Sequence, residues 1–593
     1  MSENAAVLPE QESRVVEALD KLYEFEREPV SDDKLQPGRH FAGLFSGEHV
    51  AGTEFVIGAM FVKWGASPLD IFVGLLLGNL LAVLTWTFVC APIAVRTRLT
   101  LYWYLRQVAG PATTTIYNVL NAFLFCILAG CMITVSASAV RIPFGIPEQT
   151  GVIPTDIRFV FVVVAVGAVV VTLAILGFKR LSQFSEVCSP WMFLMFMAGA
   201  VVMLPTLAGT TSGAGGIRSL HDFWVIASQK VWTGVNPEGV KAIGFWHVAA
   251  FAWICNLAMH AGLSDMAVLR YAPKWYYGFY SGFGMFLGHY LAWICAGIMG
   301  TAAAIIVQKS LLVLDAGAVA WQALGVSGII CVILAGWTTS NPTLYRAGLA
   351  LQAVTPGWPR WLVTLFVGAL TTLIACSPFV FNYLLNFVGI YGLLLMPVGA
   401  IVFVEHWIFP KIGFTQYWVT KKKLMVSWPA LGSWGIGMAV AFYLGVDLRQ
   451  FLLEHLQPLP HVVVTVLANW SGTLHLFFLF VPIWLLTAVL YIAFSSVAGA
   501  REKLPDLPQP KPRPAAPAPV RQLKAYSGLF WVTGIVAAGC LAICIAWPIW
   551  VFAAGADAYA DRFAAFKMNI IWPTLLYFIA GTVWYIRYEK ESA

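Results

Sequence analysis

The sequence predicts an all-α polytopic membrane protein built around two inverted five-helix units, with further membrane spans after them. Three observations indicate this class. The 593-residue chain is 59% hydrophobic and 11% charged, whereas a soluble domain carries about 25% charged residues. Apolar runs of about 20 residues, the length that crosses a bilayer, recur along it. Residues 41–208 and 243–408 each hold five such runs, and an odd number of crossings inverts the second unit relative to the first.

The chain order divides these runs into segments. Residues 1–40 are a polar N-terminal tail, 409–500 hold spans eleven and twelve, and the Pro-rich basic stretch 501–525 connects them to a terminal helix pair in 526–593. The fourteen candidate spans are 41–64, 70–95, 112–138, 157–178, 187–208, 243–262, 276–305, 326–353, 360–376, 384–408, 428–446, 470–497, 526–553 and 568–587.

The distribution of basic residues predicts the orientation. With the N-terminus inside, the cytoplasmic segments hold 26 of the 36 Lys and Arg residues, and the opposite side holds nine. This asymmetry indicates cytoplasmic N- and C-termini and an even number of crossings. We therefore expect a multi-pass protein of the plasma (inner) membrane. The net charge of +7 is then a topology signal, and we expect the lipid bilayer and a small-molecule substrate as partners, with no nucleic acid.

No pattern in the sequence indicates an enzyme. The ten cysteines lie in or beside apolar runs without disulfide or metal-site spacing. His260 and Asp265 are five residues apart, but no serine or cysteine stands at a sequence spacing from them that would indicate a nucleophile paired with a base. We interpret His289, Glu405 and His406 as helix-end or packing residues. No organic cofactor is expected.

The stretch Gly336–Leu349 carries the densest polar cluster within an apolar span. It reads G-W-T-T-S-N-P-T-L-Y-R-A-G-L. At bilayer depth an unsatisfied polar group costs several kcal/mol, so Thr338, Thr339 and Asn341 need partners. Pro342 removes a backbone donor and predicts a helix broken or loosened one turn earlier, where oxygen ligands suit a small hard cation or a polar solute. The alternative is a kinked span whose threonines bond back to the preceding turn.

The first span also carries charge within its apolar sequence. A carboxylate at mid-bilayer costs about 3 kcal/mol, so Glu54 should face a wet cavity, a cation or a ligand. Glu48 and His49 either share this environment or lie at the cytoplasmic interface ahead of a shorter helix. Gly47 and Gly52 favour a break in the helix between the two carboxylates.

The sixth span has a related pattern of polar residues. Trp253 and Asn256 lie mid-span, and an indole face with an amide beside it suits a small heterocycle. Packing is the alternative for the tryptophan, since the chain has 25 of them. The segment from His260 to Asp265 predicts the point where this helix unwinds or ends.

These motifs together resemble the nucleobase–cation symporter family, and within it the cytosine permease branch. The strongest match sets W-T-T-S-N-P-T-L-Y-R-A-G-L against that branch's W-T-T-N-D-N-x-L-Y-x-x-G-L. The resemblance covers about residues 41–410 and depends on the set as a whole. The other matching pieces are G-N-L-L-A (Gly78–Ala82), V-R-T-R-L-T (Val95–Thr100), L-S-D-x-x-x-x-R-Y (Leu263–Tyr271) and M-P-V-G-A-I-V-F-V-E-H (Met396–His406).

The resemblance implies a LeuT-type fold of two inverted five-helix units with substrate between spans one, three, six and eight. It also implies a sodium site made by the span-one backbone near Glu48 and Ala51 with the Thr338 and Thr339 hydroxyls. This chain departs from the family in three places. Span three offers Asn121 and Phe123 where relatives have Gln and Trp, and span one carries carboxylates where relatives are uncharged. After the two threonines of span eight, the usual Asn-Asp-Asn is replaced by Ser-Asn-Pro at residues 340–342.

The sequence therefore predicts a secondary active transporter that carries a nucleobase or a related small nitrogen heterocycle with Na+ by alternating access. A proton carried by Glu48 or Glu54 could replace the sodium ion, with an amine-like solute as cargo. A membrane receptor or sensor that keeps the fold without transport is the alternative from another class. The candidate substrate residues are Glu54, Asn121, Phe123, Trp253, Asn256 and Asn341.

Overall fold

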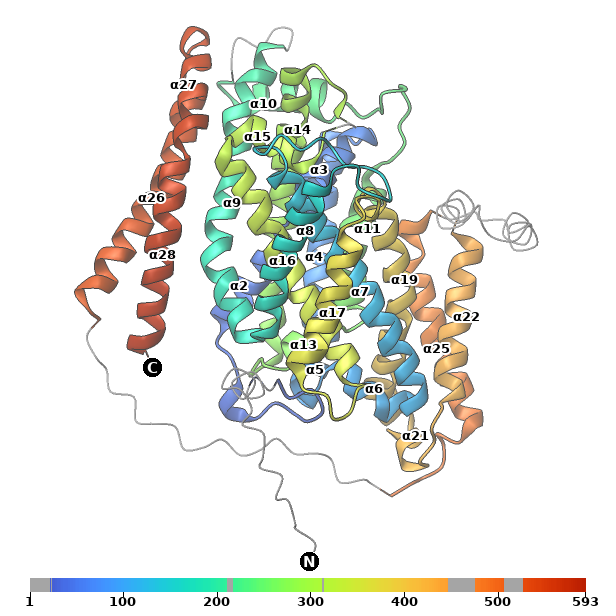
Figure 1. Cartoon of the computed structure of the whole chain (residues 1–593). Coiled ribbons are helices and arrows are strands. Elements are labelled where there is room, and N and C mark those ends of the chain that lie inside the picture. The colour runs from blue at the N-terminus through green and yellow to red at the C-terminus, as the bar shows by residue number, and fades with distance from the viewer. Residues whose placement is uncertain are drawn as a thin grey trace, which may run out of the picture.

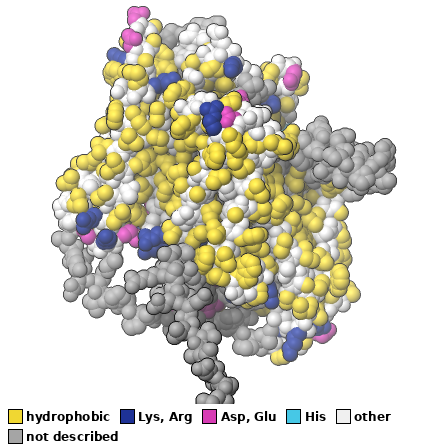
Figure 2. Space-filling view, viewed as in Figure 1, with side chains coloured by type: hydrophobic (Ala, Val, Ile, Leu, Met, Phe, Trp, Pro, Cys, Tyr) yellow, Lys and Arg dark blue, Asp and Glu magenta, His cyan; other side chains and the backbone are white. Residues whose placement is uncertain are grey.

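The computed structural model describes residues 22, 24–210, 217–311, 314–445, 475–505 and 526–592, and every regular element within those ranges is helical. Nine of the described helices are long and apolar enough to cross a membrane. Most of them stand side by side in one bundle, and the two C-terminal ones stand to one side of it (Figure 1). Figure 2 shows hydrophobic side chains over the middle of one face, with most charged side chains nearer its ends. The predicted class of polytopic all-α membrane protein is confirmed, while the count of fourteen spans stays a prediction.

The first five predicted spans correspond to α2 through α9. The first span is a pair of short helices, and the second is one continuous helix whose hydrogen-bond pattern alternates between α and π. A short helix after it begins at Thr100, whose hydroxyl accepts the Trp103 N–H. The bounds are α2 Gly38–His49, α3 Glu54–Lys63, η2 Asp70–Gly74, α4 Leu75–Thr85, η3 Trp86–Cys90, α5 Ala91–Thr97, α6 Leu101–Ala109, α7 Pro111–Val140, α8 Ile157–Ile175 and α9 Phe178–Gly209, after the 3-10 turn η1 Asp32–Lys34.

The next five predicted spans begin with α11 and again open on an interrupted helix. The connection ahead of them holds α10 Leu220–Ile226 and η4 Ala227–Val231. The remaining bounds are α11 Phe245–Ile254, α12 Leu257–His260, α13 Met266–Leu269, η5 Trp275–Tyr280, η6 Phe283–Ala292, α14 Trp293–Val307, α15 Ala316–Leu324, α16 Val326–Gln352, α17 Arg360–Ala375, α18 Phe379–Asn382, α19 Leu384–Phe403, η8 Val404–Ile408 and α20 Phe409–Ile412.

Two further pairs of helices flank the bundle on opposite sides. α22 and α25 pack against α19, whereas α26 and α28 stand beside α9 (Figure 1). Parts of the segments predicted from sequence (1–21, 446–474 and 506–525, which includes most of the Pro-rich connector) lie outside the described residues. The bounds here are α21 Trp418–Lys421, α22 Trp428–Leu444, η9 Leu476–Phe478, α25 Phe480–Ala498, α26 Gly528–Phe552, α27 Ala556–Asn569 and α28 Ile571–Ser592.

The eighth span, α16, is a continuous helix, so the predicted break at Pro342 is wrong. The hydroxyls of Ser340 and Thr343 donate to carbonyls four residues earlier, at 2.7 and 2.8 Å. Membrane helices tolerate proline when neighbouring side chains re-satisfy the backbone in this way. α16 lies close against α7 at Gly336, which has no side chain. A β-carbon there would come within 2.0 Å of Ser136 Oγ. Small residues at a helix crossing allow this approach in lipid.

The described part of the predicted N-terminal tail is docked against the helices. Arg270 is fully buried and donates to the carbonyls of Glu24 and Phe25, both at 2.6 Å. Glu24 also accepts the hydroxyl of Tyr345 at 2.8 Å. Val30 is fully buried beside these contacts. The end of this segment therefore packs against the side of the bundle where α2 begins and α16 ends.

Candidate functional site

The first membrane span is interrupted between α2 and α3. α2 ends at His49 and α3 begins at Glu54, and Val50 leaves helical geometry with φ −86° and ψ 63°. Gly52 lies in the gap, where a β-carbon would come within 2.8 Å of Val135 on α7. Glycine permits this approach and the irregular backbone around it. The break predicted between the two carboxylates is therefore present.

The sixth span is interrupted twice. α11 ends at Ile254, and Asn256 has non-helical angles of φ −116° and ψ 31° before α12 begins. α12 then ends at His260, where the sequence predicts the helix to unwind. The first of the two breaks, at Asn256, was not expected. Interrupted helices expose backbone groups to a ligand, as in many secondary transporters.

The seventh span contributes the His289 side chain to the region of these breaks, and its first part is wound as a π-helix. η6 covers Phe283–Ala292 and includes His289, and π-helical turns are frequent at functional sites. Two glycines bring this helix against the end of α2: a β-carbon on Gly288 would lie 2.0 Å from the His49 carbonyl oxygen, and one on Gly284 would lie 2.6 Å from its ring. His289 thereby reaches the break in the first span.

Glu54 lies at the centre of a buried polar cluster. The indole N–H of Trp293 donates to its carboxylate, and His289 Nε2 lies 3.7 Å from its second oxygen. The His289 ring stacks on Trp293 with centroids 4.4 Å apart. On the other edge of that ring, Nδ1 lies 3.5 Å from the Asn256 amide nitrogen. The cluster thus joins the break in span one to the break in span six.

A set of hydroxyl and carbonyl oxygen atoms lies between α2 and α16, where the first span is interrupted. The Thr339 hydroxyl lies 2.7 Å from the Glu48 carbonyl and 2.9 Å from the Ala335 carbonyl. The Thr338 hydroxyl lies 3.2 Å from the same Ala335 carbonyl. These neutral oxygens are the donors that a small hard cation prefers. The Ala51 carbonyl beside them accepts the Glu54 N–H at 3.1 Å.

The Glu48 carboxylate, by contrast, belongs to a buried ion network. Arg346 on α16 binds both of its oxygens, at 2.6 and 3.0 Å. The same guanidinium binds Asp265 at 2.9 and 2.5 Å, and the Trp86 indole donates to that aspartate at 2.5 Å. All four side chains are buried. Only the backbone carbonyl of Glu48 faces the oxygen set, so its side chain is not a cation ligand in this arrangement.

The remaining predicted substrate residues fall into two groups. Asn121 and Asn341 are buried, and the Asn121 side-chain oxygen and both polar atoms of the Asn341 side chain have no partner within the described structure. Such atoms need a water or a ligand, because an unsatisfied group costs about 1–3 kcal/mol. Trp253 packs its ring on Phe480 at 4.5 Å and bonds Thr85 instead. Phe123 is 50% exposed on the outer surface.

Several residues of these clusters were missed by the sequence reasoning. His289 was interpreted as a packing residue, and Trp293 was not singled out. Arg346 was counted among the cytoplasmic charges although it is fully buried. One signal was available for it, because Arg346 belongs to the same motif as Thr338 and Thr339, seven residues or two helical turns after Thr339. No signal in the sequence placed His289 opposite Glu54. Among the described residues, no three His, Cys, Asp or Glu side chains group as a metal site.

Comparison with solved structures confirms the LeuT-type fold. No protein family and no curated protein sequence matches the chain. The nucleobase–cation-symport transporter Mhp1, in a closed conformation with bromovinylhydantoin bound, aligns with a TM-score of 0.58 at 16% identity, over 81% of this chain and 96% of that one. A Na+-coupled sialic acid symporter in a substrate-bound outward-open state aligns with a TM-score of 0.52 at 12% identity, over 83% and 97%.

The comparisons agree with the sequence-based resemblance at the level of the fold. The LeuT-type architecture predicted from the motifs is confirmed, and both of these similar structures are transporters. Identities of 12–16% leave the substrate and the ion to be argued from the residues of this chain.

Proposed function

We propose that this protein is a secondary active transporter that moves a small nitrogen-containing solute with a cation by alternating access. The observation that carries the proposal is the juxtaposition of the two interrupted helices at Glu54, His289 and Asn256. Opening either side of such a site requires only that half-helices move, since the backbone is already broken between them.

The solute class follows from the chemistry of the cluster. A buried carboxylate, an imidazole and an amide offer acceptors and donors within one small region, and the Trp293 ring adds an aromatic surface. Glu54 suits an N–H edge or a positive charge on the solute. Asn341 and Asn121 carry unpaired polar atoms elsewhere in the bundle, where they would bond water or the solute along its path. A nucleobase or a related nitrogen heterocycle matches these requirements, and an amine-like solute matches the carboxylate. Phe123 and Trp253 are not part of the proposed site.

The oxygen set at Thr339 supports sodium as the coupling ion. The Thr338 and Thr339 hydroxyls and the Glu48 and Ala335 carbonyls would hold it, and the ion would neutralise partial negative charge where α2 ends. A cation there ties α2 to α16. Solute and ion would then favour the same arrangement, so each would raise the affinity of the other.

A proton is the second candidate, and one observation assigns it to Glu54 over Glu48. Glu48 already accepts two hydrogen bonds from the Arg346 guanidinium. Glu54 contacts His289 and Trp293, and no Lys or Arg of the described structure lies within ion-pair distance of it. A buried carboxylate without a fixed cation can carry a proton through a transport cycle.

Uptake into proteoliposomes separates these possibilities. Radiolabelled cytosine, uracil, hydantoin and a small amine are offered with a sodium gradient, with a proton gradient, or with neither. Sodium-driven uptake that Thr339→Ala abolishes supports the sodium version. Sodium-independent uptake whose pH response disappears in Glu54→Gln supports the proton version. Tight binding without uptake or counterflow under any gradient would contradict transport and favour a receptor.

A further inference from the structure

The terminal helix α28 does not close fully onto the bundle. It is tied to α9 by Tyr577, whose hydroxyl donates to the Val187 carbonyl at 2.8 Å, and by Glu589, which accepts the Gln183 amide at 2.9 Å. A cavity of about 700 Å³ nevertheless remains between the two helices; it is partly open, and its lining residue Ile586 is 48% exposed. This volume is within the range of roughly 300–1,000 Å³ that small-molecule sites occupy.

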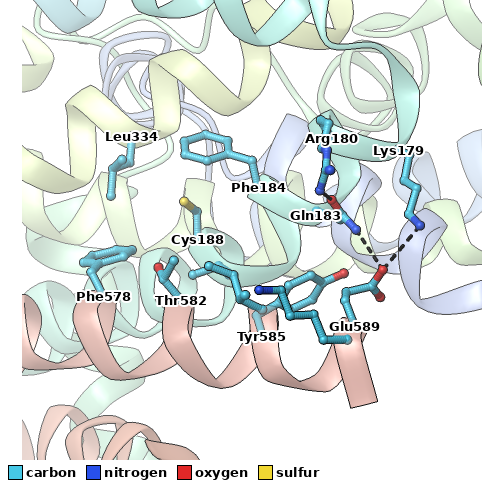
Figure 3. A pocket seen from close by; sticks show the side chains of 13 residues that line it. Lys179, Arg180, Gln183, Phe184, Cys188, Leu334, Phe578, Thr582, Tyr585 and Glu589 are labelled. Carbon is cyan, nitrogen blue, oxygen red and sulfur yellow. Dashed lines mark hydrogen bonds and ion pairs between the residues drawn. The ribbon is translucent and has the colours of Figure 1, made fainter. Parts of the chain in front are cut away.

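The lining of this cavity is divided by polarity along its length. Lys179, Arg180 and Glu589 line one end (Figure 3), and Lys590, which follows Glu589 on α28, also lines the cavity. Phe184, Leu334 and Phe578 line the other end (Figure 3). The charged end carries three positive side chains and one negative one, and Lys179 is 55% exposed even though it pairs with Glu589 at 3.4 Å. The charged end therefore carries positive charge that Glu589 does not neutralise, and this charge can bind an anion from outside the protein.

We propose that this cavity binds an anionic glycerophospholipid. Its phosphate would lie at the Lys179, Arg180 and Lys590 end, and an acyl chain would follow the apolar wall toward Leu334 and Phe578. A gap that opens sideways from a membrane helix faces lipid, so an amphipathic molecule from the bilayer matches both of its ends. Basic pockets between helices on the cytoplasmic side favour anionic headgroups, and the distribution of Lys and Arg predicts that side here.

The proposal accounts for how α28 is attached. The helix carries its own cation, Lys590, into the cavity, while Glu589 next to it holds α9 and also pairs with Arg39 at the start of α2. A lipid phosphate would bridge Lys590 on α28 to Lys179 and Arg180 on α9. The terminal hairpin would then be joined to the bundle partly through lipid. This binding is independent of the solute and ion proposed above.

The test measures lipid binding to the purified full-length protein by native mass spectrometry. The protein is delipidated and titrated with phosphatidylglycerol, with phosphatidylcholine, and with phosphatidylglycerol in the presence of inorganic phosphate. The pocket variant is Lys179→Gln, Arg180→Gln and Lys590→Gln combined. The control is Lys421→Gln, Lys422→Gln and Lys423→Gln combined, which removes the same charge from the same predicted side outside the cavity.

We expect the pocket variant to bind phosphatidylglycerol at least about tenfold more weakly than the unaltered chain. We also expect the control to bind it normally, and inorganic phosphate to compete poorly. Thr582→Trp, at an exposed cavity-lining position, should weaken lipid binding by filling the apolar part without changing charge. Equal weakening in both triple variants, equal affinity for phosphatidylcholine, or full displacement by inorganic phosphate would each overturn the proposal.

Discussion

At the scale of single residues, buried charges define this molecule. A charge at mid-bilayer costs about 3 kcal/mol even on insertion scales, yet Glu48, Glu54, Asp265 and Arg346 are all 4% exposed or less. Three of them form one network, in which the Arg346 guanidinium binds both carboxylates. Glu54 lies outside that network, with only neutral donors and a histidine around it. Its position is therefore best explained by a ligand or proton that it binds.

Replacing Glu54 with glutamine should weaken solute binding and slow uptake to a reduced but measurable rate while keeping the fold. A hydrogen bond to a charged group is worth about 1.5–3 kcal/mol, so we expect solute affinity to fall at least about tenfold. The initial uptake rate and the solute dissociation constant measure this. Glu405→Gln is the matched control, because Glu405 is an equally buried carboxylate that bonds Tyr491 at 2.8 Å, away from the cluster. Equal loss in both variants would contradict a specific role for Glu54.

Arg346→Met should destabilise the protein strongly, because it leaves Glu48 and Asp265 buried without their cation. Breaking a buried pair from one side costs about 3–5 kcal/mol. Thermal unfolding in detergent measures the loss. Adding Glu48→Gln and Asp265→Asn to the same chain should restore most of it, since no charge is then unpaired. The exposed pair of Arg158 and Asp156 gives the control, where Arg158→Met should cost less than about 1 kcal/mol.

At the scale of elements, the site depends on helices that depart from regular α-geometry. Span one and span six are interrupted, and the π-helix η6 turns His289 toward them. Glycine makes the crossing of these elements possible, since a β-carbon on Gly58 would lie 2.4 Å from the Trp293 carbonyl oxygen. The glycines at these positions therefore allow α2, α3 and the seventh span to approach one another closely.

Gly288→Ala should destabilise the protein and impair uptake. Its β-carbon would lie 2.0 Å from the His49 carbonyl oxygen, a backbone atom that cannot rotate away. Overpacking of this kind costs about 1–3 kcal/mol. Gly539→Ala in α26 has no heavy atom within 4 Å of the new carbon, and it should be neutral or stabilise by up to about 1 kcal/mol. Melting temperatures that fall equally in both variants would show that the crossing is not tight.

At the scale of the whole molecule, orientation across the membrane is the first property to test. Each described cysteine is buried except Cys376, which is partly buried, so background labelling should be low. Lys411→Cys after α19 should react with an impermeant maleimide only in inside-out vesicles. Lys241→Cys before α11 should react only in right-side-out vesicles, and it is 57% exposed. The reverse pattern would overturn the cytoplasmic placement of both termini.

Much of the fold was predictable because each membrane span corresponds to a continuous run of apolar residues in the sequence. The hydrophobic runs marked the spans, and the polar residues at Glu48, Glu54 and His260 marked two of the interruptions. The prediction failed at Pro342, because the hydroxyls around it satisfy the helix from within. The sequence did not predict that the segment near Glu24 docks against the helices, because this contact depends on Arg270, which is distant in the chain.

By itself, the sequence determined the membrane class and the presence of Glu54 and the two threonines within apolar stretches, because hydrophobicity and polarity act residue by residue. Tertiary structure alone decided the partners. It placed His289 opposite Glu54, turned the Glu48 side chain to Arg346 and its carbonyl to Thr339, and left Phe123 on the surface. These outcomes depend on the helix rotations and crossings that packing sets across more than two hundred residues of chain, which no local pattern encodes.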